Sequence, residues 1–433
     1  MVSGGPSNHS IMNNRVLPSQ AVILCGGLGT RLRPLTHDLP KPMVLVNGRP
    51  FLHHLLEQLA EQGITRFYLL TGYLNEKISN YFEDGAKYGW SIEYSVGPIE
   101  WDTGRRIWEA RSNFDTQFLL LYSDNFVQFN LSNLLSLHYK LNSDISLIVS
   151  PKQNGNIKIA ENGQVLGYDK TRKEHGFDYV EVGYMMIQKD AILNKFSQCT
   201  NFPNFNFSEL LSKLAQDQRL SGLVVRDPYH SISDPERLAL MVEYLQPKKI
   251  LLIDRDGTIN EKAPKGEYIT NWKEFFWIPE TRRAMLKLSK QGFKFIVITN
   301  QAGIARQMIS YESLENIHNN MIDELKATGI EVLRVYACPD HWNEYSFMRK
   351  PEPGMFFQAA KDFNLKLDNC LYVGDDERDC IAAANAGCGM VYITDESSQP
   401  VLKDPPKSLF VSQSFENAVS HIINKYEVWK SRG

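Results

Sequence analysis

Two aspartates, two residues apart, form the strongest chemical signal in this sequence. They lie in Ile250-Leu-Leu-Ile-Asp254-Arg-Asp256-Gly-Thr-Ile-Asn260, where an apolar run ends and a glycine turn begins. Carboxylates at the carboxyl end of a parallel strand face the crevice in which open α/β sheets bind ligands. One can attack phosphorus while the other protonates the leaving oxygen and later activates water. Taken alone, such a pair is as typical of a solvated turn or a helix cap as it is of a catalytic site.

Phosphoryl transfer also needs cationic and hydroxyl groups around the phosphate, because two aspartates alone would repel it. Three further segments supply such groups. Thr299-Asn300-Gln301 follows the apolar run 295–298, Arg349-Lys350-Pro351 precedes a helical stretch, and Gly374-Asp375-Asp376 follows the run 371–373. The sequence therefore places a hydroxyl, an ammonium and a further carboxylate at strand ends or adjacent loops.

In this order the four segments resemble the haloacid dehalogenase phosphatases, whose motifs are DxDGT, a Ser or Thr after a second strand, a Lys, and GDxxxD. The resemblance implies Mg²⁺ held by Asp254, Asp256 through its carbonyl, and Asp375, which suits a hard cation. It also implies that Asp254 is the nucleophile and that Asp256 is the acid/base. Thr299 and Lys350 would bind the phosphate, and Asn300 and Arg349 would bind the rest of the substrate.

Within that superfamily the segment 248–395 is most similar to the D-glycero-D-manno-heptose 1,7-bisphosphate phosphatases. Histidinol phosphatases and the 3′-phosphatase domains of polynucleotide kinases share parts of the pattern. The heptose family usually carries a zinc loop with Cys-Pro-His and Cys-x-Cys before Arg-Lys-Pro. Here Cys338 alone is in register, and Asp340, Ser346 and Met348 occupy the other positions. His341 could supply one more ligand but not a tetrahedral set, so we predict no structural zinc.

A second chemical segment is glycine-rich and basic: Ala21-Val-Ile-Leu-Cys25-Gly-Gly-Leu-Gly-Thr-Arg31-Leu-Arg33. Backbone amides freed by the glycines can cradle phosphates, and Arg31 adds a planar fork for phosphate oxygens. The glycine spacing does not fit a dinucleotide fingerprint, and the absence of Gly-Lys-Ser/Thr excludes a Walker loop.

With Pro40-Lys41-Pro42-Met43 following, residues 20–245 look like the sugar-1-phosphate nucleotidyltransferases, including heptose 1-phosphate guanylyltransferases. The resemblance implies that Lys41 neutralises the reacting phosphates and that Asp124 binds Mg²⁺. It implies residues holding the NTP phosphates, namely Gly26, Gly27, Gly29, Thr30 and Arg31, and residues lining the sugar-phosphate site, namely Lys170, Glu181 and Gly183. GTP is the expected NTP. No protein nucleophile is required, so positioning and charge neutralisation carry the rate.

Two departures bear on this activity. The family has small residues beside the base where this chain has Arg105 and Arg106, which we interpret as a solvated helix start or, less favoured, an anion site. The family has a second metal-binding aspartate where this chain has Ser231, a poor Mg²⁺ ligand, although Asp227 or Asp234 could reach the ion instead.

The elements that position these residues follow a βαβ pattern of buried strands and helical stretches. The apolar runs lie at 21–24, 67–70, 118–122, 145–149, 250–253, 295–298, 371–373 and 390–393. Because these runs are apolar at nearly every position, we expect an α/β fold of two domains, each a mostly parallel sheet flanked by helices. The first domain is expected to be Rossmann-like and the second Rossmannoid. The expected divisions are a disordered leader (1–19), a nucleotidyltransferase-like domain (20–246) and a phosphatase domain (247–433).

Composition excludes several classes of protein. The chain has 433 residues, 43% of them hydrophobic, and a net charge of −3, which favours a small-molecule substrate over nucleic acid or a membrane surface. The six cysteines show no paired spacing, which fits free thiols in the cytoplasm. Whether the chain forms a homo-oligomer is left open.

Both motif sets together predict a bifunctional enzyme of nucleotide-activated heptose synthesis, since the phosphatase product is the substrate of the transferase. The alternatives for the N-terminal half are a degenerate module that binds a nucleotide or sugar phosphate, as a sensor would, and a purely structural or dimerising domain.

Overall fold

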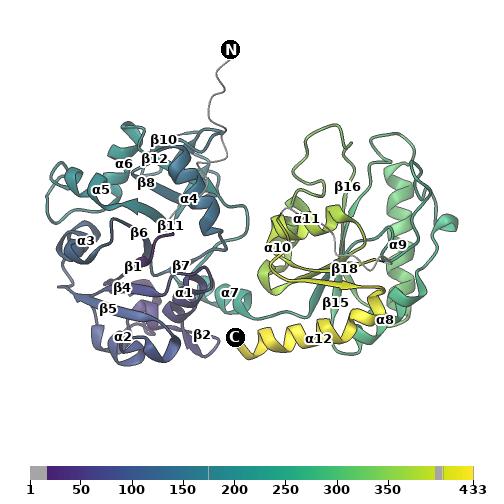
Figure 1. Ribbon diagram of the computed structural model, residues 1–433, viewed down its shortest axis with the longest axis horizontal. Helices are drawn as coiled ribbons and strands as arrows, with labels where there is room; N and C mark the ends of the chain where they lie inside the picture. Colours follow the sequence, from purple (N-terminus) through teal and green to yellow (C-terminus); the bar gives the residue numbers. More distant parts are fainter. Residues whose placement is uncertain (1–16, 174, 395–401, 403, 433) are drawn as a thin grey trace, which may run out of the picture. The chain divides into compact units, whose positions relative to one another are not determined.

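The computed structural model describes residues 17–173, 175–394, 402 and 404–432 (Figure 1). The chain divides into two compact units, Met1–Met241 and Val242–Gly433. The domain boundary expected between residues 246 and 247 lies just inside the second unit. Residues 1–16 of the expected leader lie outside the described residues.

The N-terminal unit contains a nine-stranded sheet, one half of which is parallel. In that half β1 (Gln20–Cys25) lies between β4 (Arg66–Thr71) and β6 (Gln117–Tyr122), and β5 (Ser91–Val96) follows β4. All six residues of β1 are buried, as expected of a central strand covered on both faces. The glycine-rich loop therefore begins at the carboxyl end of a rigid central strand.

The other half of this sheet is mixed. Strand β11 (Tyr179–Gln188) runs antiparallel to both β6 and β8 (Ile145–Pro151). The remaining strands of the sheet are β9 (Ile157–Ile159), β10 (Val165–Tyr168) and β12 (Leu220–Val224). The α-helices of this part of the chain are α1 (Phe51–Ala60), α2 (Asn75–Phe82), α3 (Thr103–Ala110), α4 (Leu131–Lys140), α5 (Lys189–Phe196), α6 (Ser208–Gln216) and α7 (Pro235–Leu245).

Two short strand pairs complete the unit. Strand β2 (Leu45–Val46) pairs with β3 (Arg49–Pro50). Strand β7 (Asn125–Phe126) pairs with β13 (His230–Ser231) and so brings two distant parts of the chain together.

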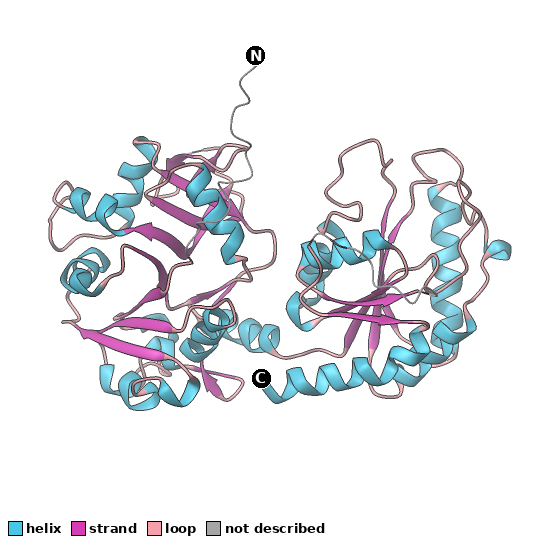
Figure 2. Cartoon of the chain, viewed as in Figure 1, coloured by secondary structure: helices cyan, strands magenta, loops and turns pink. Residues whose placement is uncertain are grey.

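The C-terminal unit has a six-stranded sheet in which every neighbouring pair is parallel (Figure 2). Its spatial order is β16 (Val332–Cys338), β15 (Lys294–Asn300), β14 (Ile250–Ile253), β17 (Leu371–Gly374), β18 (Gly389–Ile393) and β19 (Leu409–Ser412). Strand β14, the first in the chain, lies in the middle beside β15 and β17. The carboxyl ends of these three strands therefore share one edge of the sheet.

Helices cover both faces of this sheet. Residues of α8 (Pro279–Ser289), α9 (Tyr311–Ala327) and α12 (Phe415–Arg432) form one apolar core with it. Residues of α10 (Gly354–Phe363) and α11 (Glu377–Ala386) form a second core. All residues of β14 and β17 are buried, because each strand faces a core on both sides.

These elements confirm the predicted fold class, since all of the apolar runs fall inside strands. All six cysteines are buried and free. Within the described part of the chain, no helix combines the length and apolar character that a bilayer crossing requires.

Candidate active sites

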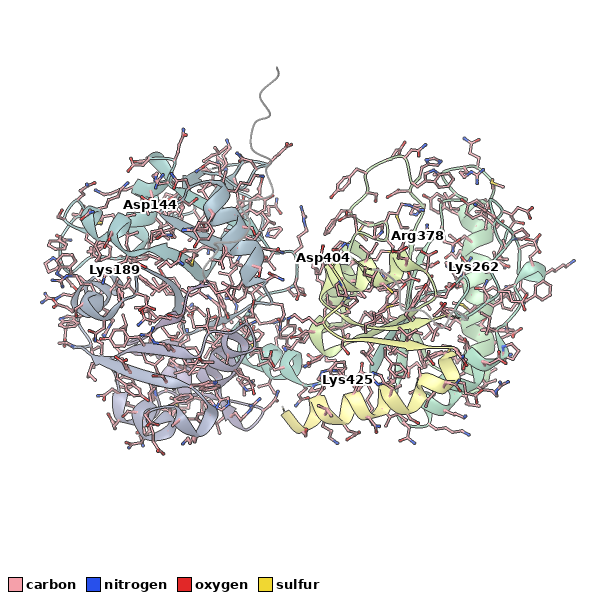
Figure 3. The ribbon with its side chains drawn as sticks, viewed as in Figure 1. Asp144, Lys189, Lys262, Arg378, Asp404 and Lys425 are labelled. Atoms are coloured by element: carbon pink, nitrogen blue, oxygen red, sulfur yellow. The ribbon has the colours of Figure 1, made fainter. Side chains whose placement is uncertain are left out.

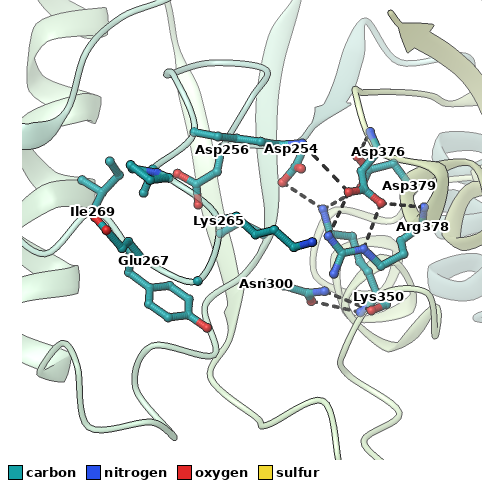
Figure 4. Close-up of a pocket in the computed structure, with 16 residues that line it drawn as sticks. Asp254, Asp256, Lys265, Glu267, Ile269, Asn300, Lys350, Asp376, Arg378 and Asp379 are labelled. Carbon is teal, nitrogen blue, oxygen red and sulfur yellow. Dashed lines mark hydrogen bonds and ion pairs between the residues drawn. The ribbon is translucent and has the colours of Figure 1, made fainter.

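Three carboxylates meet at the edge of the C-terminal sheet. Asp254 directly follows β14, Asp375 directly follows β17, and Asp379 lies in the first turn of α11. One oxygen of each lies within 4.8 Å of those of the other two, the only such set of three metal-ligating side chains among the described residues. Figure 4 shows Asp254 and Asp379 in this arrangement. Asp254 and Asp375 thus lie close enough to share one cation.

A buried ammonium group joins two of these carboxylates. Lys350 Nζ lies 2.8 Å from Asp254 Oδ1 and 2.7 Å from Asp379 Oδ1. The same nitrogen donates to the carbonyl of Ile298 (3.1 Å) and to the hydroxyl of Tyr372 (2.7 Å), and the side chain is only 4% exposed. Burial alone would lower the pKa of Lys350, but the two aspartates raise it above its usual value. Lys350 is therefore a fixed positive charge at the base of the site.

The charge balance around Asp254 favours binding of a cation. Burial and the nearby charge of Asp379 raise the pKa of Asp254 above its ordinary value, although Lys350 opposes this shift. A divalent ion among these carboxylates would stabilise the ionised form of Asp254. The donor set consists of hard oxygen ligands, which fits Mg²⁺.

The second aspartate of the pair is held by three donors. Arg255 Nη2 donates to both carboxylate oxygens of Asp256 at 2.9 Å, and Asn260 and Gln301 donate to one oxygen each. Burial would raise the pKa of Asp256, but these donors hold it below its usual value. Arg255 is itself buried and donates to His318 Nε2 at 2.9 Å. The orientation of the Asp256 carboxylate therefore depends on Arg255 and, through it, on His318.

A pocket of about 210 Å³ opens over these groups. Its walls include the predicted phosphate-binding and substrate-binding residues Thr299, Asn300 and Lys350, whereas Arg349 is not among its lining residues. Arg349 instead donates to the carbonyl of Asp340 at 3.0 Å. Its neighbour Lys350, and not its own guanidinium, therefore forms part of the wall.

Three basic residues of the pocket wall were not predicted: Lys262, Lys265 and Arg378. Figure 3 labels Lys262 and Arg378, which come from the loop after β14 and from α11. The lysines lie in a loop without a recognisable motif. Asp379, by contrast, could have been found, because it is the last residue of the GDxxxD spacing that begins at Gly374.

The loop that corresponds to the family's zinc loop is closed by hydrogen bonds. Cys338 Sγ donates to Asp340 Oδ2 at 3.4 Å, and the hydroxyl of Ser346 donates to the same oxygen. Burial raises the pKa of the Cys338 thiol, which opposes the thiolate that zinc requires. His341 stacks on Trp342. These residues do not fit a zinc site, and the absence of zinc remains a prediction.

The N-terminal unit has a larger cavity, of about 610 Å³, at the carboxyl end of β1. Most of the predicted residues line it, namely Gly26, Gly27, Gly29, Thr30, Arg31, Lys41, Asp124, Lys170 and Glu181. Gly183 is not among the lining residues. A side chain at Gly183 would collide with Tyr122, since its Cβ would lie 2.6 Å from that ring. Gly183 therefore allows Tyr122 to form the wall.

One carboxylate and one ammonium group face each other in this cavity. Lys41 Nζ lies 2.7 Å from Asp124 Oδ2. The pairing of β13 with β7 brings Ser231 opposite Asn125, next to Asp124. The hydroxyl of Ser231 lies 3.1 Å from Ser233 Oγ and 3.4 Å from Arg237 Nη1. The position of the family's second metal-binding aspartate is thus close to Asp124 along the backbone, but it carries a neutral, buried side chain that is not among the lining residues of the cavity.

The two suggested replacements for that aspartate lie elsewhere. Neither Asp227 nor Asp234 is among the lining residues of the cavity. Asp227 is buried, and Asp234 accepts from the backbone N–H of Arg237 at 3.0 Å. The structure therefore does not bring either carboxylate into the site.

Arg106 corrects the interpretation made from the sequence. It is not part of a solvated helix start but is buried, and its guanidinium donates to the carbonyls of Thr71 (2.9 Å) and Pro98 (2.6 Å). A Cβ added at Gly26 would lie 2.3 Å from its Cζ. The guanidinium thus donates to backbone carbonyls, and Arg106 is also among the lining residues of the cavity. Arg105 remains near the surface, where it pairs with Glu109.

The two halves of the chain match different families. Residues 20–227 match the family described as nucleotidyl transferase, and residues 249–387 match polynucleotide kinase 3 phosphatase. The N-terminal half is 32% identical over 223 residues to D-glycero-alpha-D-manno-heptose 1-phosphate guanylyltransferase from Campylobacter jejuni. That alignment covers 50% of this chain and 96% of the relative.

The C-terminal half has relatives of two kinds. It is 34% identical over 127 residues to a probable D-glycero-D-manno-heptose-1,7-bisphosphate 7-phosphatase from Thermoplasma volcanium, covering 29% of this chain and 85% of the relative. It is 33% identical over 187 residues to the histidine biosynthesis bifunctional protein HisB from C. jejuni, covering 43% of this chain and 53% of the relative. The chain spans about half the length of the bifunctional relatives that it matches.

The order of the motifs, the strand ends that carry them and these matches all agree. The chain belongs to the nucleotidyl transferase family through its N-terminal half and to the haloacid dehalogenase-like phosphatases through its C-terminal half.

Proposed function

We propose that this protein is a bifunctional enzyme that dephosphorylates a heptose 1,7-bisphosphate and then transfers a nucleotidyl group to the resulting heptose 1-phosphate. The observation that carries the first activity is the convergence of Asp254, Asp375 and Asp379 within 4.8 Å of one another, beside a pocket that Asp254, Asp379 and Lys350 line. The second activity is supported by the cavity that the glycine-rich loop, Lys41 and Asp124 share.

In the phosphatase half, Mg²⁺ would be held by Asp254, the carbonyl of Asp256, and Asp375, and would neutralise the phosphate oxygens. Asp254 attacks phosphorus, the bond from phosphorus to the sugar oxygen breaks, and an aspartyl-phosphate forms. Asp256 passes a proton, taken up from the bound phosphate monoester or from solvent, to the leaving sugar oxygen. Lys350 and Thr299, which both line the pocket, would bind the phosphate oxygens.

In the second half of the reaction, water attacks the aspartyl-phosphate and Asp256 takes its proton. The donors around Asp256 suit this step because they stabilise the ionised carboxylate that acts as the base. Inorganic phosphate leaves and Asp254 is regenerated. Arg255 and His318 act on this cycle indirectly, by holding the carboxylate of Asp256 in place.

In the nucleotidyl transferase half, the sugar phosphate attacks the α-phosphorus of the NTP and pyrophosphate leaves. The backbone of residues 26–30 and Arg31 would hold the NTP phosphates, and Lys41 would neutralise the reacting ones. Asp124 would bind Mg²⁺ together with phosphate oxygens of the nucleotide. GTP is the NTP we propose, since one relative that matches this half is a guanylyltransferase.

The buried carboxylate of Glu181 supports a sugar site beside these phosphates. Its Oε1 accepts from the hydroxyl of Tyr168 at 2.7 Å, while Oε2 is buried and has no hydrogen-bond partner among the described residues. A buried acceptor of this kind is costly unless a ligand satisfies it. Sugar hydroxyls are donors of the required type.

A second candidate for the N-terminal half is a module that binds a nucleotide or sugar phosphate without turning it over. Ser231 favours it, because a hydroxyl stands at the position of the family's second metal-binding aspartate, opposite Asn125. In this case ligand binding would raise the unfolding temperature although no product forms.

One incubation tests both candidates. The full chain is mixed with heptose 1,7-bisphosphate, Mg²⁺ and one NTP at a time, and phosphate and pyrophosphate are measured separately. Release of both, with pyrophosphate appearing only with the correct NTP, is the expected result. Phosphate without pyrophosphate for any NTP would contradict the bifunctional proposal, and absence of phosphate would contradict the phosphatase assignment itself.

A further inference from the structure

A second lysine stands at the three-carboxylate site and is not assigned any role by the proposed mechanism. Lys262 Nζ lies 2.5 Å from Asp375 Oδ2 and 3.9 Å from Asp376 Oδ2. Lys350 takes the other two carboxylates of the cluster. Each of the three carboxylates thus has an ammonium partner within the protein.

Lys262 reaches this position by crossing the glycine turn of the Asp254 motif. A Cβ added at Gly257 would lie 2.4 Å from Lys262 Cε and 2.4 Å from Asp375 Oδ2. Gly257 also has a φ of 89°, which side-chain-bearing residues rarely adopt. The missing side chain at residue 257 therefore opens the path by which Lys262 contacts Asp375.

The two lysines differ in how firmly they are held. Lys350 is 4% exposed and its ammonium group has four polar contacts, whereas the side chain of Lys262 is 46% exposed and, among the described residues, pairs with Asp375 and Asp376. A long, flexible side chain with few contacts moves at little cost. Of the two, Lys262 is the one that can leave its carboxylate.

Metal binding and this ion pair compete for the same oxygens. Asp375 Oδ2 carries the ammonium group of Lys262, and Oδ1 accepts from the hydroxyl of Thr258 at 3.1 Å. A divalent cation needs a lone pair of this carboxylate and repels an ammonium group at such a distance. The ion can bind Asp375 fully only when Lys262 has moved.

We propose that Lys262 is the counter-ion of Asp375 in the metal-free protein and that a divalent cation displaces it into the pocket, where its ammonium group binds the substrate phosphate. This inference rests on the proposed metal-dependent phosphatase. The released side chain stays within the pocket because Lys262 is one of its lining residues. Metal binding would thereby add a positive charge to the phosphate site besides that of the metal itself.

The test is a titration of the full chain with Mg²⁺ in a calorimeter, without substrate. Lys262→Gln should bind Mg²⁺ about three- to fivefold more tightly than the wild type, because a competing, partly exposed ion pair has been removed. Lys262→Arg keeps the charge and should stay close to the wild type. Lys265→Gln is the matched control, since Lys265 lines the same pocket, has no ion pair among the described residues, and should leave Mg²⁺ affinity unchanged.

A second measurement tests the fate of the released side chain. With Mg²⁺ saturating, the inhibition constant of inorganic phosphate should rise in Lys262→Gln relative to the wild type. Unchanged Mg²⁺ affinity in Lys262→Gln, or an unchanged phosphate constant, would overturn the inference and leave the phosphatase proposal standing. A wild-type chain whose Mg²⁺ heat is also present in Asp375→Asn would instead overturn the proposed metal site.

Discussion

The two candidate sites handle negative charge in opposite ways. In the C-terminal unit three carboxylates crowd together around Lys350 and Lys262. In the N-terminal unit Asp124 pairs with Lys41, and the adjacent position on β13 carries the neutral Ser231. The first site carries three carboxylates against two ammonium groups, whereas in the second one carboxylate faces one ammonium group.

This difference predicts when each site acquires its metal. A crowded carboxylate site binds Mg²⁺ before the substrate arrives, while a site with one carboxylate relies on phosphate oxygens of the nucleotide to complete the ion's ligands. The same chain would thus use a resident ion in one half and an ion that enters with the nucleotide in the other. The following predictions test this contrast.

The largest effect is expected at Asp254. Asp254→Asn removes the nucleophile and should lower phosphate release at least about a thousandfold, because no aspartyl-phosphate can form. Release of phosphate and pyrophosphate is measured side by side. Pyrophosphate formation from heptose 1-phosphate should be unchanged, which serves as the internal control for folding. Near-normal phosphate release would show that another group attacks phosphorus.

A smaller effect in the opposite direction is expected at Ser231. Ser231→Asp supplies a second hard ligand beside Asp124 and should raise pyrophosphate formation about tenfold when Mg²⁺ is limiting. The assay uses heptose 1-phosphate and GTP over a range of Mg²⁺ concentrations. Ser231→Asn is the matched control, since it has the same size without the charge. An equal gain in both variants would mean that charge is not the cause.

The next prediction concerns pH and the support of Asp256. Burial and the charge of Arg255 lower the pKa of His318 to about 3 in the folded protein, against about 6.5 when unfolded. The unfolded chain therefore binds more protons between these values. Stability from this residue is complete above pH 6.5 and is lost as the pH falls toward 3, by about 2 kcal/mol between pH 7 and pH 5.

His318→Gln removes this titration but keeps an acceptor for Arg255. Urea unfolding at pH 7 and pH 5 should show a smaller loss of stability in the variant than in the wild type. Equal losses would indicate that His318 is not held neutral, and the chain of contacts from His318 through Arg255 to Asp256 would need another explanation.

The smallest expected effect is a null result in the Cys338 loop. Because Asp340 accepts from both Cys338 and Ser346, we expect elemental analysis to find no stoichiometric zinc. A chelator should leave the unfolding temperature in the absence of Mg²⁺ unchanged. One zinc ion per chain would contradict the prediction and would add a third kind of metal site to the comparison.

Much of the fold could be predicted because buried parallel strands are apolar at nearly every position and end at polar motifs. The same logic placed Asp254, Asp375 and Thr299 near one another, since neighbouring parallel strands end on the same edge. Asp379 could also have been predicted from the sequence, because its spacing from Asp375 is fixed by the GDxxxD motif. These residues share a feature, namely that local backbone geometry determines where they lie.

Other residues could not be placed in this way. Lys262 contacts Asp375 through a long side chain that crosses a turn, and no spacing rule anticipates that path. Arg106 was misjudged because a helix start usually faces solvent, yet carbonyl groups of three separate segments surround its guanidinium. In both cases contacts between segments distant in the sequence, rather than local pattern, determine the environment.

The buried thiols described above have a practical consequence for following this protein in solution. Burial raises the pKa of Cys25 and Cys380 to about 12 and that of Cys199 to about 11, so little reactive thiolate is present at neutral pH. A cysteine introduced at the surface of each unit would react with a maleimide dye ahead of the native ones. Fluorescence energy transfer between such dyes could then report the separation of the two domains during turnover, without replacing any native cysteine.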